Sequence, residues 1–254
     1  MSNLLGFWTL LKRETLRFFS LPNQTIWPSV VSVSLYIVIF GFFLGKQVTE
    51  IEGQPYIVFI FPGLLMMSVV MASFQNSSTS LFIARWEHFI DDLLVAPISF
   101  MAMVLAYSIA AVIRGVVTGA LVLIVGLFLV PTPLEHPVLL FWALVASSTV
   151  FATSGLVAGL WAERWDHIAI VLNYVVTPLM FLGGVFYATS TLPSGFKWVN
   201  ELNPIFYMVC AARYAFVSQA DAPYGLSLLI TSILALFFLV WAIYLFRIGY
   251  KLRT

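Results

Sequence analysis

Histidine and cysteine, which serve as metal ligands and as partners in nucleophilic catalysis, are few and scattered in this chain. The histidines are His88, His136 and His167, and the single cysteine is Cys210. No histidine stands four residues from another or beside the cysteine, as two ligands of one metal ion often do. The sequence therefore predicts no metal site, and a lone cysteine closes no internal disulfide.

The acidic residues also give no indication of a catalytic site, and phosphate-binding motifs give none either. We expect every Asp and Glu to lie in a loop, so no paired carboxylates or midplane acid are predicted inside a buried site. No glycine-rich loop ending in Lys-Ser or Lys-Thr occurs, so the chain has no phosphate cradle of its own. We predict no catalytic residues, no cofactor in this chain and no enzymatic activity.

The composition says what kind of scaffold carries these residues. Hydrophobic residues make up 61% of the 254 residues and charged residues 9%, with a mean hydropathy of +1.01. A soluble domain carries roughly a quarter charged residues. The chain is therefore predicted to be one integral membrane domain over residues 1–254. Its net charge of +1 gives no basic face for nucleic acid.

Long intervals without charge predict an all-α fold of six transmembrane helices. Apolar stretches of twenty residues or more suit helical spans, whereas a β-barrel alternates over ~10 residues. The expected spans cover about residues 26–44, 56–80, 98–130, 137–161, 168–187 and 224–246. Glycine pairs four residues apart, such as Gly115 with Gly119 and Gly155 with Gly159, favour close packing of these helices within the chain over a dimer face.

The distribution of cations predicts the orientation. One side would hold eight Lys and Arg residues with both termini, and the other side three. By the positive-inside rule, both termini are cytoplasmic.

Arg114 is the one ion within a predicted span. Counting ~1.5 Å per residue from Pro97 places it about 25 Å along a straight helix, in the outer half of the membrane. Two roles remain open: contact with an anionic headgroup or pyrophosphate in a pathway, or a structural role in hydrogen bonds to carbonyls or to polar residues of a neighbouring span.

Residues 1–20 are predicted to form an amphipathic helix in the cytoplasmic interface. Leu4, Trp8 and Phe18 belong to its apolar side, while the cations lie elsewhere on the helical wheel. These cations are Lys12, Arg13 and Arg17. The alternative is a soluble leader turn.

Residues 84–97, between the second and third spans, are predicted to form a second amphipathic helix. Trp86, Phe89, Ile90, Leu93 and Leu94 recur at helical spacing on one face, and Pro97 favours a stop. The opposite face carries Arg85, Glu87, His88, Asp91 and Asp92. Anionic lipid would repel its acidic cluster, which favours a protein partner over a helix floating at the interface.

Residues 188–223 follow the fifth span and are predicted to form short re-entrant helices in the outer leaflet. The apolar run at 205–212 is too short to cross the membrane. A crossing here would also place the two termini on opposite sides.

These segments together resemble the permease subunit of bacterial type-2 ABC exporters, over essentially the whole chain. The resemblance rests on the acidic helix ending DDLLVAP at 91–97, on GGVFY at 183–187, on LNPIFY at 202–207 and on FPGL at 61–64. It implies a homodimeric pathway in the bacterial inner membrane and two separate ABC ATPase subunits that bind ATP and Mg. The helix over 84–97 is similar to the coupling helix that docks on the ATPase, and residues 1–20 to the interface helix.

The resemblance also implies an outer gate built from residues 188–223, with Asn203, Pro204, Tyr207 and Arg213 as candidate residues. Substrates within the family include lipid-linked glycans, lipids and drugs, so we expect export of an amphipathic or lipid-linked molecule through a membrane-embedded permease. The alternative is a secondary transporter or channel that works alone. A membrane-embedded enzyme is disfavoured because acids and a nucleophile are missing at depth.

Overall fold

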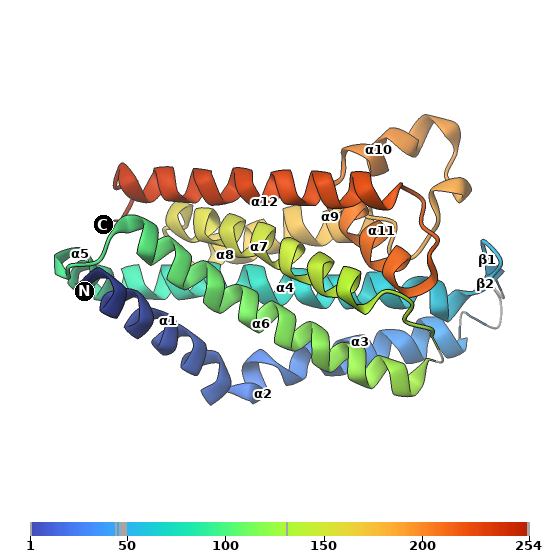
Figure 1. The fold of residues 1–254 in the computed structure, drawn as a ribbon, viewed down its shortest axis with the longest axis horizontal. Coiled ribbons are helices and arrows are strands. Elements are labelled where there is room, and N and C mark those ends of the chain that lie inside the picture. The colour runs from blue at the N-terminus through green and yellow to red at the C-terminus, as the bar shows by residue number, and fades with distance from the viewer. Residues whose placement is uncertain (1, 44, 46–49, 131, 253–254) are drawn as a thin grey trace.

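The structure is a computed structural model that describes residues 2–43, 45, 50–130 and 132–252. Within these residues the chain is almost entirely helical, apart from an antiparallel hairpin of β1 (Glu50–Ile51) and β2 (Gln54–Pro55). The long helices run side by side in an elongated bundle (Figure 1). Both ends of the described chain and α5 (Phe89–Val95) lie at one end, called here the terminal end, and β1, β2 and α10 (Lys197–Leu202) lie at the opposite end, called the hairpin end.

Among the described residues, five helical runs are long and apolar enough to cross a membrane. Two shorter apolar runs, Trp165–Phe181 and Pro204–Val217, accompany them. The long runs are Pro22–Gly41, α4 (Tyr56–Trp86), α6 (Phe100–Leu129), α7 (Pro137–Trp161) and α12 (Tyr224–Arg247). These runs confirm the prediction of an all-α integral membrane protein.

Several runs are built from more than one segment. Pro22–Gly41 comprises α2 (Pro22–Thr25), α3 (Trp27–Tyr36) and the start of a π-helical segment, Ile37–Phe43. Trp165–Phe181 comprises α8 (Trp165–Val171), a π-helical turn (Leu172–Val176) and α9 (Thr177–Phe181). The remaining elements are α1 (Ser2–Ser20), α11 (Pro204–Val217) and the 3-10 turns Thr189–Thr191 and Ser194–Phe196.

Helix α4 forms the centre of the bundle and packs against α6 and α7 along much of its length. Small residues allow this close approach. A Cβ added to Gly155 of α7 would stand 2.7 Å from the backbone oxygen of Phe74, and one added to Gly115 of α6 would stand 2.0 Å from Ser73 Oγ. The glycine pairs of α6 and α7 therefore serve packing within the chain, as predicted.

Three element boundaries differ clearly from the sequence prediction. Helix α4 continues to Trp86, six residues beyond the predicted end of the second span near residue 80. The run predicted to continue to 187 ends at Phe181, shortly before Gly184, which adopts a left-handed conformation with φ of +70°. The predicted helix over 84–97 is interrupted at His88, which has φ of 57° and separates α4 from α5. A left-handed residue cannot continue a right-handed helix, so α5 begins a new direction.

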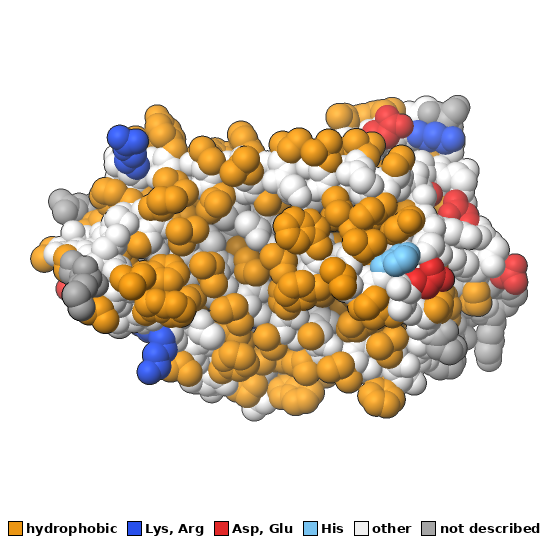
Figure 2. Space-filling view, viewed as in Figure 1, with side chains coloured by type: hydrophobic (Ala, Val, Ile, Leu, Met, Phe, Trp, Pro, Cys, Tyr) orange, Lys and Arg blue, Asp and Glu red, His pale blue; other side chains and the backbone are white. Residues whose placement is uncertain are grey.

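The surface agrees with a membrane setting. Hydrophobic side chains cover the middle of the face shown in Figure 2, while its Lys, Arg, Asp and Glu side chains lie mostly toward the two ends. Helix α12 buries only Ser227, Thr231, Ala242 and Phe246 of its 24 residues. The apolar side chains of an exposed helix of this length are stable in contact with lipid and not in contact with water.

Candidate functional site

The α4–α5 junction at the terminal end holds the charged residues predicted to meet a partner. Glu87, His88 and Asp92 are exposed, and Asp91 is half exposed with its carboxylate 3.4 Å from His88 Nδ1. On the opposite side of α5, Ile90 is buried in a cluster with residues of α1, α6, α7 and α12. Four of the predicted residues thus form one exposed charged surface, called here the α5 face.

Arg85 does not belong to the α5 face, contrary to the prediction from helical spacing. It is the last basic residue of α4 and is only 4% exposed. Its Nη1 donates to the carbonyl oxygens of Gly159, Leu160 and Ala162, each at 2.9 Å. These carbonyls end α7 and lack helical partners, so Arg85 caps that helix.

Two large apolar side chains beside the α5 face are exposed. Trp86 is 70% exposed, although helical spacing predicts it on the apolar face, and Val95, which lies outside that predicted face, is 85% exposed. The turn at His88 rotates Trp86 away from the α5 packing side. Exposed large apolar residues next to charges are typical of a protein contact surface.

Helix α1 lies against this junction and presents its predicted cations in three ways. Lys12 is exposed to solvent. The Arg13 guanidinium stacks over the ring of Phe89 in α5, 3.5 Å from its centroid. Arg17 approaches Glu14, with its Nε 3.4 Å from the carboxylate. Helix α1 and α5 are therefore joined, and both border the terminal end.

Glu14 is a buried acid, although the sequence predicts every Asp and Glu in a loop. It is 2% exposed, and its carboxylate accepts a hydrogen bond from Ser80 Oγ of α4. Its position between the cations of α1 gave no sign of burial. The signal that was available is the polar stretch 75–80 at the end of the second span, which needed partners.

Arg114 lies on the floor of a polar cavity between α1, α2, α4 and α6, with a volume of ≈ 360 Å³. It is 7% exposed, and it donates from Nη1 to Asn76 Oδ1 at 3.3 Å and from Nη2 to the Thr25 carbonyl at 3.1 Å. We call this the arginine cavity. Its polar lining includes Arg13, Glu14, Arg17, Gln24, Thr25, Asn76, Thr79, Ser80, Glu87 and Arg114.

The side chain of Arg114 reaches from α6 to the neighbouring helix α4. Asn76 stands ten residues before the end of α4, in its half toward the terminal end. The guanidinium is therefore held at that level and not in the opposite half of the bundle. The count along the sequence concerns the Cα atom of Arg114 in α6, and its membrane depth stays a prediction.

The candidate gate residues near the hairpin end surround the start of α11. Asn203 caps this helix by accepting from the Ile205 N–H, and its Nδ2 donates to the Leu179 carbonyl at 2.7 Å. Pro204 occupies the first turn, where its missing N–H is tolerated. The hydroxyl of Tyr207 donates to the Glu201 carbonyl at 2.9 Å. These contacts join α9, α10 and α11.

Arg213, further along α11, is 2% exposed and forms a buried ion pair. Its Nη1 is 2.8 Å from Asp221 Oδ2, its Nη2 donates to the Gly184 carbonyl at 2.8 Å, and its guanidinium lies 3.8 Å from the centroid of the Phe59 ring. This one residue connects α11, α4 and the segment after α9.

A polar network continues from this ion pair through residues not predicted from the sequence. Asp221 Oδ1 accepts from the Thr189 N–H at 3.0 Å. Asn200 is fully buried, donates to Thr189 Oγ1 and accepts from the hydroxyl of Tyr187 at 2.9 Å. Arg213 and Asp221 are opposite charges eight residues apart in an apolar region, which is the signal that could have identified the pair.

A mixed pocket lies between α3, α4 and α9, with a volume of ≈ 250 Å³. It combines hydroxyls, an amide and flexible thioethers, a lining that suits a molecule with both polar and apolar parts. The residues include Ser29, Ser32, Ser68, Gln75, Thr177, Met67, Met71 and Met180. We call it the α3–α4–α9 pocket; the sequence analysis did not predict it.

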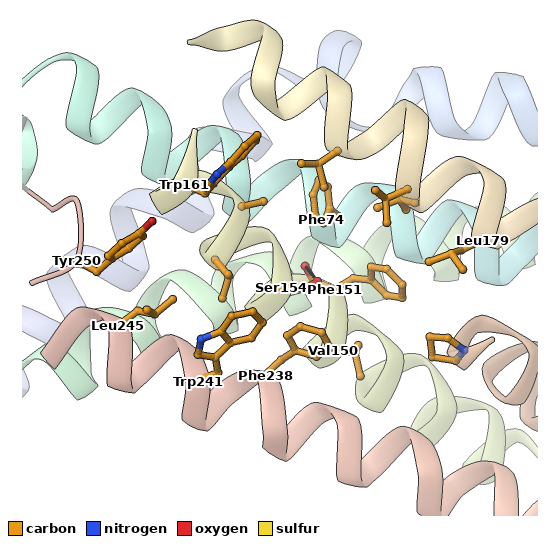
Figure 3. Close-up of a pocket in the computed structure, with 16 residues that line it drawn as sticks. Phe74, Val150, Phe151, Ser154, Trp161, Leu179, Phe238, Trp241, Leu245 and Tyr250 are labelled. Atoms are coloured by element: carbon orange, nitrogen blue, oxygen red, sulfur yellow. Dashed lines mark hydrogen bonds between the residues drawn. The ribbon is translucent and has the colours of Figure 1, made fainter. Parts of the chain in front are cut away.

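An apolar cleft of ≈ 480 Å³ lies between α7, the run Trp165–Phe181 and α12. Figure 3 shows Tyr250 and Trp161 toward one end, Leu179 at the other, and Phe151 between them. Apart from the tyrosine, Ser154 is the residue that contributes a hydroxyl group to this lining. Such a cleft can hold hydrocarbon but offers no group for acid–base chemistry.

Histidines and acids at the two ends serve local contacts. His136 Nε2 lies 3.1 Å from Ser218 Oγ, and the Glu163 N–H donates to His167 Nδ1. Lys251 binds Glu163, and this hydrogen bond and charge lower the pKa of the Glu163 carboxyl. Over the part of the chain that the structure describes, no group of three or more His, Cys, Asp or Glu side chains is placed to hold a metal ion.

The long apolar helices are those of a multi-pass helical membrane protein. The sequence profile of the ABC-2 type transporter family matches residues 6–217. The chain therefore belongs to the ABC-2 type transporter family, and it is an inner-membrane transport permease of that family.

Relatives cover most of the chain. The Inner membrane transport permease YadH of Escherichia coli (strain K12) is 35% identical over 243 residues, covering 93% of this chain and 95% of the relative. Nodulation protein J of Bradyrhizobium diazoefficiens is 25% identical over 174 residues, covering 68% of this chain and 66% of the relative. Nodulation protein J of Rhizobium meliloti is 20% identical over 203 residues, with 80% and 78% covered.

Proposed function

We propose that this chain is the transmembrane subunit of an ATP-driven exporter that moves an amphipathic or lipid-linked molecule out across the bacterial cytoplasmic membrane. A separate ABC ATPase subunit binds ATP and Mg and supplies the energy. The observation that carries the proposal is the α5 face, which exposes Glu87, His88 and Asp92 beside Trp86 at the terminal end. Family membership supports the ATPase partner.

The proposed topology has six crossings with both termini in the cytoplasm. The first and last described residues lie at the same end of the bundle, which supports an even number of crossings (Figure 1). Five runs have spanning length, and the run Trp165–Phe181 supplies the sixth with 17 residues, or about 25 Å at 1.5 Å per residue. The excess of Lys and Arg at the terminal end supports a cytoplasmic location.

The surface proposed to dock the ATPase combines α5 with α1. Arg13 stacks on Phe89, so movement of α5 is transmitted directly to α1. The packing of Ile90 with residues of α6, α7 and α12 gives a second path into the bundle. We assign α1 as the interface helix and the α4–α5 junction, within residues 84–97, as the coupling element.

The proposed substrate path follows the α3–α4–α9 pocket, in a dimer of two permease chains. Its serines, Gln75 and methionines accommodate both polar and apolar parts of a substrate. At the hairpin end, residues 188–223 form the proposed outer gate. The network of Arg213, Asp221 and Asn200 holds α11 and the segment after α9 in one arrangement.

Membrane lipid is the proposed partner of the apolar cleft between α7 and α12. The cleft opens beside the exposed helix α12, where acyl chains would lie. Lipid there would fill space and would not require a polar contact.

The test is reconstitution with the ABC ATPase that copurifies with the tagged chain. We expect ATP hydrolysis by the complex and none by the permease alone, with the rate stimulated by the exported class of molecule. Candidate lipid-linked glycans, phospholipids and drugs can be compared in nanodiscs. An ATPase with a substituted P-loop lysine is the control. ATP-independent transport by the permease alone would instead support the secondary transporter or channel.

A further inference from the structure

The arginine cavity contains a buried cation that has no opposite charge beside it. Arg114 binds one side-chain amide and one carbonyl, and among the described residues it forms no ion pair. Its Nε is buried with no hydrogen-bond partner in the described chain. A charge buried in a membrane domain is costly unless it is paired. The cavity therefore lacks an anion that would compensate this charge.

The other charged residues of the cavity do not compensate the positive charge of Arg114. Glu14 is already engaged by Ser80 and approached by Arg17. Glu87 lines the cavity at the exposed end of α4 and belongs to the α5 face. Three arginines and two glutamates thus line the cavity. Arg114, which forms no ion pair among the described residues, is the most buried of the three arginines.

The surroundings of the cavity suit an amphiphile. Gln24 and Leu21 line it and are exposed, so they mark its mouth. In the same stretch of the chain, residues 16–27, large apolar side chains are exposed. They are Leu16 at 52%, Phe19 at 47%, Leu21 at 50% and Trp27 at 54%.

We propose that the arginine cavity binds the phosphate group of an anionic membrane amphiphile from the leaflet at the terminal end. The phosphate accepts hydrogen bonds from Arg114 and Arg17, whose planar guanidinium groups match phosphate geometry. The acyl chains lie against Phe19, Leu21 and Trp27. This site goes beyond the proposed export function, because it requires neither the ATPase nor a particular exported substrate.

The experiment measures lipid binding by the purified full-length permease in detergent, without the ATPase. Phosphatidylglycerol and phosphatidylcholine are titrated separately, and bound lipid is counted by native mass spectrometry. We expect tighter binding of phosphatidylglycerol, whose phosphate carries an uncompensated negative charge. Inorganic pyrophosphate is then added as a competitor. Displacement shows that phosphate alone is recognised, and persistence shows that the acyl chains contribute; both support the site.

Variants at the mouth separate binding from folding. Gln24→Glu adds a negative charge to the lining and should weaken phosphatidylglycerol binding roughly threefold to tenfold. Gln24→Arg should strengthen it. Asn23→Glu is the matched control, because Asn23 is the exposed neighbour and does not line the cavity. Since both positions are exposed, all three variants should fold.

A fourth variant tests the floor of the cavity. Arg114→Gln should abolish the preference for phosphatidylglycerol over phosphatidylcholine. If it fails to accumulate, the Gln24 series still decides the matter. Equal binding of the two lipids by the wild type, or equal binding by the Gln24→Glu and Asn23→Glu variants, would overturn the proposal.

Discussion

Replacement of Arg213 by Met tests the buried ion pair near the hairpin end. Met has a long apolar side chain that preserves part of the packing but removes the charge and its donors. Asp221 would keep the Thr189 N–H but lose its cation, and the Gly184 carbonyl would lose its donor. Contact of the guanidinium with the Phe59 ring would also be lost.

The expected loss follows from burial of both partners. Arg213 is 2% exposed as a side chain and Asp221 is 3% exposed. Removing one partner of a buried pair costs about 3 to 5 kcal/mol, because the other charge remains buried and unpaired. At about 2 to 4 °C per kcal/mol for a chain of this size, the melting temperature should fall by about 6 °C or more. Removing both charges, with Arg213→Met and Asp221→Asn together, should recover much of this loss.

The assay is thermal unfolding of the detergent-purified variants, followed by the loss of monodisperse protein. Lys197→Met is the matched control, because Lys197 is an exposed cation of α10 at the same end of the bundle. We expect Arg213→Met to fall well below Lys197→Met, and the double variant to lie between them. A single variant as stable as Lys197→Met, or a double variant as unstable as Arg213→Met, would refute the reasoning.

Three further predictions concern packing, topology and the substrate path. Gly155→Ala should destabilise the protein by about 1 to 3 kcal/mol, because the new Cβ meets the Phe74 carbonyl, whereas Gly225→Ala in α12 meets open space and should leave the melting temperature unchanged. Reporters inserted at Gly53 and fused after the C-terminus should lie on opposite sides of the membrane; signals from the same side would contradict the six crossings. Ser32→Trp should block transport while leaving ATPase association intact, whereas Val31→Trp on the exposed neighbouring position should transport normally. Equal transport by these two variants would exclude the α3–α4–α9 pocket as the path.

The helical membrane fold could be predicted because it depends on composition along short stretches. The interval from Gly53 to Ala84 contains no charge, and α4 occupies it from Tyr56 onward. The cost of burying a charge in hydrocarbon makes such an interval decisive without knowledge of tertiary contacts. The exposed position of Asp92 could also be predicted, because helical periodicity separates the charged face from the apolar face.

The roles of buried polar residues could not be predicted because their partners are distant in the sequence. Arg85 binds carbonyls of residues 159 to 162, which no local pattern connects to it. Glu14 meets Ser80, which is 66 residues away. On a helical wheel both residues look like members of a charged surface. Only the packing of α4 against α1 and α7 places them inside.

Docking of an ABC ATPase on the α5 face is tested most directly by copurification of the ATPase with the tagged permease when the charge of this face is reversed. Asp91→Lys and Asp92→Lys together replace two negative charges at the proposed contact, where like-charge juxtaposition costs several kcal/mol. Glu201→Lys, an exposed acid at the hairpin end, is the control.

We expect the double variant to reach the membrane at normal levels, because Asp92 is exposed and Asp91 is half exposed. It should lose the ATPase and ATP-dependent transport, while Glu201→Lys retains both. Undiminished ATPase association and transport by the double variant would contradict the assignment of the α5 face as the docking surface.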